Sequence, residues 1–64
     1  MTYVLLLRGS CIVFGDLLHV NSIKVRIKDR YRCEEKDFEI RHAKIDDVIE
    51  LPEELQYIRK EIGA

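Results

Sequence analysis

A row of basic side chains in the middle of the chain is the pattern that most directly suggests a function. Every even-numbered position from 24 to 32 is basic, whereas the odd-numbered positions from 23 to 31 are mostly apolar or aromatic. A period of two is typical of a β-strand with one buried face, so the basic side chains would share the other face. About 6.6 to 6.8 Å would separate successive cations, which suits a phosphate backbone or an acidic protein surface. The row consists of Lys24, Arg26, Lys28, Arg30 and Arg32.

Two interpretations of this row remain open. In the first, the cations contact nucleic acid and the ring of Tyr31 stacks on a base. In the second, the row is the solvated face of a strand, where Lys and Arg also oppose edge-to-edge aggregation, and Tyr31 belongs to the core. Five consecutive even positions carry no acidic, amide or hydroxyl side chain. This uniformity exceeds what solubility requires, and it leads us to the binding interpretation.

The remaining reactive residue types predict neither an enzyme nor a metal site. His19 and His42 each have a single carboxylate nearby in sequence, whereas a metal site needs several converging ligands. Cys11 and Cys33 stand 22 positions apart and match no redox or zinc motif, so we expect two reduced thiols, with a disulfide as the alternative. We therefore predict no catalytic residues, no metal and no cofactor.

The pattern of apolar residues and turn signals predicts an α+β fold. A twisted antiparallel sheet of about five short strands, partly open or barrel-like, would carry one C-terminal helix. Pro52 suits the first turn of that helix and Gly63 its end, while apolar residues recur at helical spacing between them. Residues 43–50 fit either a helix face or a short strand. The expected strands are 3–7, 11–14, 17–20, 23–32 and 38–41.

The chain has 64 residues, 47% of them hydrophobic and 36% charged, and we expect one small folded domain over residues 1–64. A core of this size is marginal without a disulfide, a metal or a partner, so we expect a homodimer.

The apolar run Val4–Leu7 reads as a strand covered on both faces. The same run is too short to span a bilayer or to act as a signal peptide, which predicts a cytoplasmic protein without membrane contact.

Charge is unevenly distributed along the sequence. Residues 24–44 contain eight basic and five acidic side chains, a net charge of +3, whereas residues 45–64 contain two basic and six acidic side chains, a net charge of −4. The acidic tail would repel a phosphate backbone unless it points away from the basic row. It also favours a second function class, in which either charged segment docks on a protein of opposite charge.

Two segments resemble the carbon storage regulator family of small dimeric RNA-binding proteins. The run YVLLLRGSCIVFGD has Gly9 at its first turn and Gly15-Asp16 after its second strand, as that family does. The run FEIRHAKIDDVI has the rhythm of the family's last strand, which leads through a His-Arg pair into a C-terminal helix. Together the two runs cover under half of the chain.

The resemblance implies a role for two residues, although this sequence departs from the family pattern at several positions. It implies that Arg41 and His42 contact RNA and that two copies exchange strands in a dimer. However, the family's basic residues on the first strand correspond to Leu6 and Leu7 here, and its His-Arg pair is reversed.

The leading functional prediction is a small prokaryotic or viral regulator that binds nucleic acid, with RNA favoured. The alternative is a protein-interaction module or inhibitor that uses the basic strand or the acidic C-terminal segment. The predicted nucleic-acid site comprises Lys24, Arg26, Lys28, Arg30, Tyr31, Arg32, Arg41 and His42.

Overall fold

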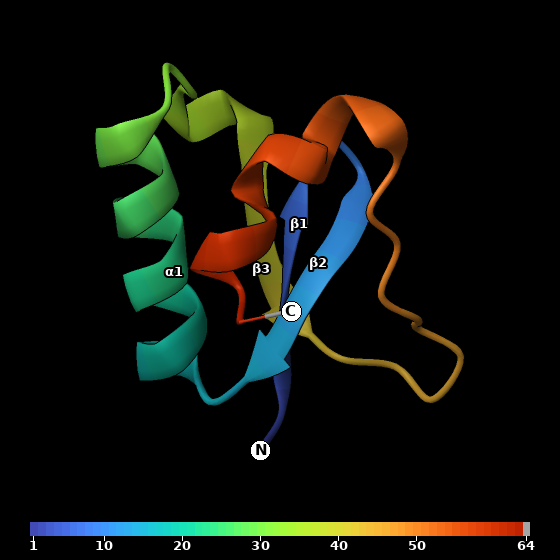
Figure 1. Ribbon diagram of the computed structural model, residues 1–64. Helices are drawn as coiled ribbons and strands as arrows, with labels where there is room; N and C mark the ends of the chain where they lie inside the picture. Colours follow the sequence, from blue (N-terminus) through green and yellow to red (C-terminus); the bar gives the residue numbers. More distant parts are fainter. Residues whose placement is uncertain (64) are drawn as a thin grey trace.

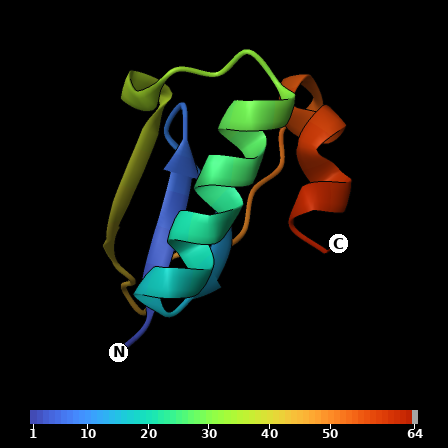
Figure 2. The same cartoon turned by 90° about the vertical axis from the view of Figure 1, so that its left-hand side faces the viewer.

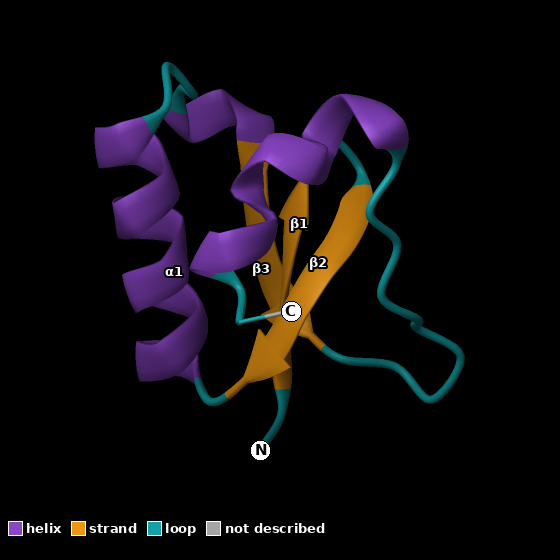
Figure 3. Cartoon of the chain, in the orientation of Figure 1, coloured by secondary structure: helices purple, strands orange, loops and turns teal. Residues whose placement is uncertain are grey.

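The chain begins with a β-hairpin whose first strand becomes the centre of the sheet. The computed structural model describes residues 1–63 and places a three-stranded antiparallel sheet, in the order β2-β1-β3, against helices (Figures 1 and 3). The elements are β1 (Tyr3–Leu7), β2 (Ser10–Gly15), α1 (Leu17–Arg30), the short 3-10 helix η1 (Glu35–Asp37), β3 (Phe38–His42) and the 3-10 helix η2 (Glu53–Glu61).

The turn between β1 and β2 depends on left-handed backbone conformations. Arg8 and Gly9 have φ angles of 52° and 85°, a region that Gly enters at little cost and other residues rarely adopt. The register of the hairpin shifts between Leu5 and Leu6, where β2 contributes one extra residue. The strands that the sequence predicted over 3–7, 11–14 and 38–41 are confirmed to within a residue or two.

Helix α1 occupies the segment where two strands were expected, so those two predictions are wrong. Asp16 caps the helix, because its carboxylate accepts a hydrogen bond of 2.7 Å from the backbone N–H of His19. Neither Gly nor Pro interrupts the chain between positions 17 and 30. The sheet therefore has three strands within residues 1–63, and the α+β class holds without the five-stranded sheet.

The alternation of residues 23–32 was misleading because a helix can satisfy much of the same pattern. Val20, Ile23 and Ile27 are buried at the three- and four-residue spacing of a helix face. Val25, which a strand would bury beside Ile27, is 45% exposed. The odd-numbered apolar residues therefore do not share one face.

Both faces of β1 are buried, as the sequence predicted. Leu5 and Leu7 belong to the core cluster that α1 and η2 cover. Val4 and Leu6 point to the opposite face and are also buried. The segment 43–52 runs along that second side of the sheet, away from α1 (Figure 1).

The expected C-terminal helix appears as η2, which begins directly after Pro52. Leu55 and Ile58 from this helix enter the same core cluster as α1. Residues 43–50, which the sequence assigned to either a helix or a strand, form neither: a turn at 45–46 interrupts an otherwise irregular segment that continues to residue 52.

The different burial of Ile27 and Val25 predicts unequal losses of stability when either side chain is shortened. Ile27→Val removes one methylene from a fully buried site and should lower the free energy of unfolding by about 0.5 to 1.5 kcal/mol. Val25→Ala should change it by less than about 0.5 kcal/mol, because the site is partly in water. Urea unfolding of both variants checks this, and equal losses would contradict the helical assignment.

Candidate interaction surface

Helix α1 divides the basic row among different directions. Successive residues of an α-helix are rotated by about 100°, so positions two apart point to nearly opposite sides. Lys24 and Lys28 share one side of α1, Arg26 and Arg30 share another, and Arg32 lies beyond the end of the helix. The geometry that motivated a common phosphate-binding face is therefore absent from these five residues.

Two of the cations are bound to a carboxylate of η1. The Nζ atoms of Lys24 and Lys28 lie 2.7 and 2.8 Å from the two carboxylate oxygens of Glu35. Their hydrogen bonds lower the pKa of Glu35 to about 2. These contacts hold the segment before β3 against the side of α1.

A third cation and the predicted stacking residue contact η2 instead. Arg30 lies 3.3 Å from the carboxylate of Glu61, which is only 4% exposed. The hydroxyl of Tyr31 donates to the same carboxylate at 3.2 Å, and its ring meets that of Tyr57 edge-on, with centroids 4.9 Å apart. Burial and this hydrogen bond raise the pKa of Tyr31. Arg30 and Tyr31 thus connect the end of α1 to η2.

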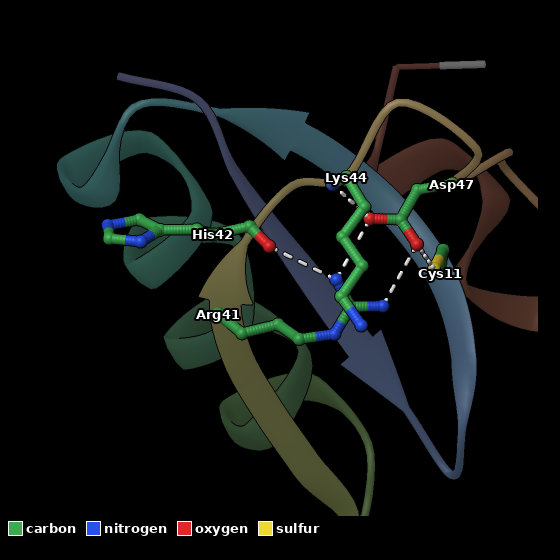
Figure 4. A network of polar contacts seen from close by, with 5 residues as sticks. All are labelled: Cys11, Arg41, His42, Lys44 and Asp47. Carbon is green, nitrogen blue, oxygen red and sulfur yellow. Dashed lines mark hydrogen bonds and ion pairs between the residues drawn. The ribbon is translucent and has the colours of Figure 1, made fainter.

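A network of polar contacts among Cys11, Arg41, His42, Lys44 and Asp47 lies on the side of the sheet away from α1 (Figure 4). Arg41 of β3 makes two hydrogen bonds of 2.9 Å to the two carboxylate oxygens of Asp47. Asp47 also accepts from the backbone N–H of Lys44 at 2.6 Å, and the Sγ of Cys11 lies 3.9 Å from its Oδ1. Arg41 donates in addition to the carbonyl of His42 at 3.1 Å.

This network changes the acidity of two groups. The hydrogen bond from Arg41, followed by that from the Lys44 backbone, holds the pKa of Asp47 well below its ordinary value. Burial, and then the negative charge of Asp47, raise the pKa of the Cys11 thiol. Asp47 is therefore a stable anion, whereas Cys11 is disfavoured as a thiolate nucleophile.

The Asp47 network fixes the segment 43–52, and two further backbone contacts fix its flanks. Ala43 donates its N–H to the carbonyl of Thr2 at 2.9 Å, and Glu50 donates to the carbonyl of Cys11 at 2.8 Å. The segment is therefore attached beside β3, at Asp47, and beside β2. Between these attachments lie three exposed apolar residues, Ile45, Val48 and Ile49.

Sequence reasoning missed this arrangement because it left residues 43–50 without a fixed conformation. The available signal was three β-branched apolar residues among acidic ones, in a pattern that fits a helix face as well as a short strand and therefore decides for neither. Residues 45–54 contain five acidic side chains and no basic one. The segment thus presents apolar side chains within an anionic surrounding.

A second apolar surface lies on α1. Leu17, Leu18 and Val25 are exposed on the outer side of the helix, and Leu17 and Leu18 line a surface depression together with Asn21. These residues, Leu17, Leu18, Asn21 and Val25, are called the α1 stripe below. The stripe was not expected from the sequence, because Leu17, Leu18 and Val25 were predicted to lie in two separate strands.

The eight predicted nucleic-acid residues are thus not brought together. Lys24, Lys28, Arg30 and Arg41 each form an ion pair with a carboxylate of this chain. Arg26 and Arg32 are exposed, and the exposed His42 places its ring 4.6 Å from that of Tyr3, centroid to centroid. Nucleic-acid binding by these residues stays a prediction.

Residues 1–63 contain no group of three or more His, Cys, Asp or Glu side chains placed to hold a metal ion. Both Cys11 and Cys33 are free thiols, as the leading interpretation of their spacing predicted. None of the helices in this described part of the chain combines the length and the apolar character needed to cross a membrane.

Comparison of the chain with protein-family models, curated proteins and solved structures finds no match. The resemblance to the carbon storage regulator family therefore stays a prediction.

The depressed pKa of Asp47 predicts how stability depends on pH. The unfolded chain takes up a proton on this carboxyl near its ordinary pKa of 3.8, whereas the folded chain does so only at lower pH. The stabilisation is therefore complete above pH 3.8 and is lost as the pH falls through the pKa of the folded state. Asp47→Asn should be less stable than the parent at neutral pH and should lose less stability on acidification.

Urea unfolding between pH 7 and pH 2 measures this difference. Asp46→Asn is the matched control, because Asp46 is an exposed neighbour with the same charge. Equal acid dependence in the parent and in Asp47→Asn would contradict the assigned role of Asp47.

Proposed function

We propose that this chain is a non-enzymatic protein-interaction module that docks through residues 43–52 on a partner protein of opposite charge. The observation that carries the proposal is the exposure of three apolar side chains on a segment whose backbone is fixed. Ile45 is fully exposed, Val48 is 60% exposed and Ile49 is 48% exposed.

The fixed backbone supports binding because it reduces the entropy that association must overcome. A flexible loop would be ordered only on binding, at a cost of about 0.5 to 1.5 kcal/mol for each immobilised side chain that has many rotamers. Here Ala43, Asp47 and Glu50 already attach the segment to the sheet. The β-branched side chains of Ile45, Val48 and Ile49 also have few rotamers to lose.

The charge of the segment indicates the chemistry of the partner. Asp46 and Glu50 are exposed next to the apolar residues, and Glu53 and Glu54 follow them in the first turn of η2. A partner that fits this surface has an apolar pocket bordered by Lys or Arg. Opposite potentials would accelerate the encounter, while burial of the apolar side chains would determine how long the complex lasts.

The protein-docking interpretation uses features that nucleic-acid binding leaves unexplained. Phosphate contacts supply most of the affinity in nucleic-acid complexes, and they require free cations. Four of the eight predicted contacts are already paired with carboxylates of the chain. The experiment below therefore includes a result that would favour nucleic-acid binding instead.

Capture from a lysate of the native host tests the proposal. The parent chain, Ile45→Ser and Leu18→Ser should be compared after nuclease treatment, with the retained proteins identified by mass spectrometry. Leu18→Ser is the matched control, because Leu18 is 77% exposed but lies on α1. We expect a basic protein that the parent and Leu18→Ser retain and that Ile45→Ser retains at least about tenfold less, which corresponds to about 1.4 kcal/mol.

Two results would overturn the proposal. The first is equal retention of every partner by the parent and Ile45→Ser. The second is binding of a single-stranded RNA whose log affinity falls with log salt at about −0.7 per phosphate and weakens in Arg26→Ala. That second result would restore the nucleic-acid interpretation.

A further inference from the structure

We propose that two copies of this chain join their β3 edges about a twofold axis at Ile40 and form one six-stranded antiparallel sheet. This assembly uses the open edge of β3 and the α1 stripe, whereas the docking proposed above uses the exposed side chains of Ile45, Val48 and Ile49. Figure 2 shows β3 at the side of the molecule, with no further strand beyond it.

The backbone pairing of β1 and β3 determines which groups of β3 point outward. Arg8 donates to the carbonyl of Asp37 and Ala43 donates to that of Thr2, and these two pairs fit the register Leu5↔Ile40. In an antiparallel ladder, hydrogen-bonded pairs alternate with pairs that do not bond. Glu39 and Arg41 therefore bond to β1, whereas the N–H and C=O groups of positions 38, 40 and 42 point to the open edge.

Two of these outward groups already have partners inside the chain. The N–H of Phe38 donates to the carbonyl of Glu35 at the end of η1. The carbonyl of His42 accepts the hydrogen bond from the Arg41 guanidinium. The groups left for a second strand are the N–H and C=O of Ile40, the N–H of His42 and the C=O of Phe38.

A twofold axis at Ile40 matches this set. It places Ile40 opposite Ile40 of the other copy, so that each donates to the other, and it places His42 opposite Phe38, so that the free N–H of His42 meets the free C=O of Phe38. The same register brings the Phe38 N–H opposite the His42 C=O of the other copy. Each of these two groups already has a hydrogen-bond partner within its own chain. An axis midway between two residues would place outward groups opposite inward ones, and an axis at Glu39 or Arg41 would form only two of these four hydrogen bonds.

The side chains of β3 fit the same register. Glu39 of one copy stands opposite Arg41 of the other, on the face of the sheet that carries residues 43–52. Opposite charges on directly facing positions stabilise an antiparallel pair, and like charges destabilise it. Because the axis relates the two copies, the Glu39–Arg41 pair occurs twice. On the α1 face, the two Ile40 side chains become neighbours.

The α1 stripe adds apolar surface on the same side of the molecule. Lys24 and Lys28 contact Glu35, which precedes β3, so this side of α1 faces the open edge. The stripe continues around the helix from these lysines, away from the core. A twofold axis perpendicular to the sheet keeps both α1 helices on one face, so the stripes of Leu17, Leu18 and Val25 approach each other.

The size of the interface explains why the stripe is needed. A stable interface buries about 800 Å² on each partner, which is roughly a fifth of the 4422 Å² that this chain exposes. A five-residue strand edge covers only part of that area. Exposed apolar side chains next to the edge supply the remainder, and burying them in a second copy removes them from water.

Sedimentation equilibrium with Glu39→Lys tests the assembly. The parent should form dimers within the micromolar to millimolar range, and Glu39→Lys should bind its own copy roughly tenfold more weakly, because two attractive pairs become two repulsive ones. Glu54→Lys is the matched control with the same change in charge on the exposed side of η2. A parent that stays monomeric throughout, or equal dimerisation of Glu39→Lys and the parent, would overturn the proposal.

Amide hydrogen exchange by NMR tests the register itself. The amides of Ile40 and His42 should exchange more slowly as the concentration rises, whereas those of Glu39 and Arg41, which bond to β1, should be protected at every concentration. A dimer without this concentration-dependent protection of Ile40 and His42 would show that another surface makes the contact. Capture through Ile45 is measured separately, so either proposal can fail alone.

Discussion

The ion pair between Arg41 and Asp47 is the interaction on which the functional part of this structure depends. It connects β3, at the edge of the sheet, to a connecting segment that has no regular secondary structure of its own. Two parallel hydrogen bonds between a guanidinium and a carboxylate fix orientation as well as distance, which a single Lys contact would not do. The additional bond from the Lys44 backbone closes a turn around the same carboxylate. Residues 45–49 can therefore expose apolar side chains without losing their conformation.

This interaction also helps to cover the second face of the sheet, which the helices leave open. The central strand β1 is buried on both faces, but residues 1–63 supply only one α-helix and one long 3-10 helix to cover them. Both helices pack on the same core cluster. The second face, with Val4 and Leu6, receives the irregular segment, and a loop can stay there only when its backbone polar groups find partners. Asp47 and the backbone contacts of Ala43 and Glu50 supply those partners.

The sequence was sufficient where local signals agreed with each other. The apolar run of β1, the turn at Arg8-Gly9 and the helix after Pro52 each combine a residue pattern with a turn or cap residue, and each is present in the structure. The strand prediction for residues 23–32 failed because their period of two competed with a helical period that only Val20, Ile23 and Ile27 reveal. The cap at Asp16 was the local signal that could have decided between them.

The candidate surfaces were harder to predict because they depend on contacts distant in sequence. Whether a cation is free depends on carboxylates such as Glu35 and Glu61, whose positions follow only from the packing of α1 against η1 and η2. In the same way, the exposure of Ile45 follows from the attachment of its neighbour Asp47 to β3. Charge and hydrophobicity along the chain therefore identified unusual segments without showing which of their side chains remain available.

The central claim is that residues 45–49 are held rigidly while their apolar side chains face solvent, and backbone ¹⁵N relaxation measures it most directly. The account predicts order parameters of about 0.85 for residues 45–49, as in the strands, and lower values in Asp47→Asn. Order parameters below about 0.6 for this segment in the parent chain would show a flexible loop and would contradict the account.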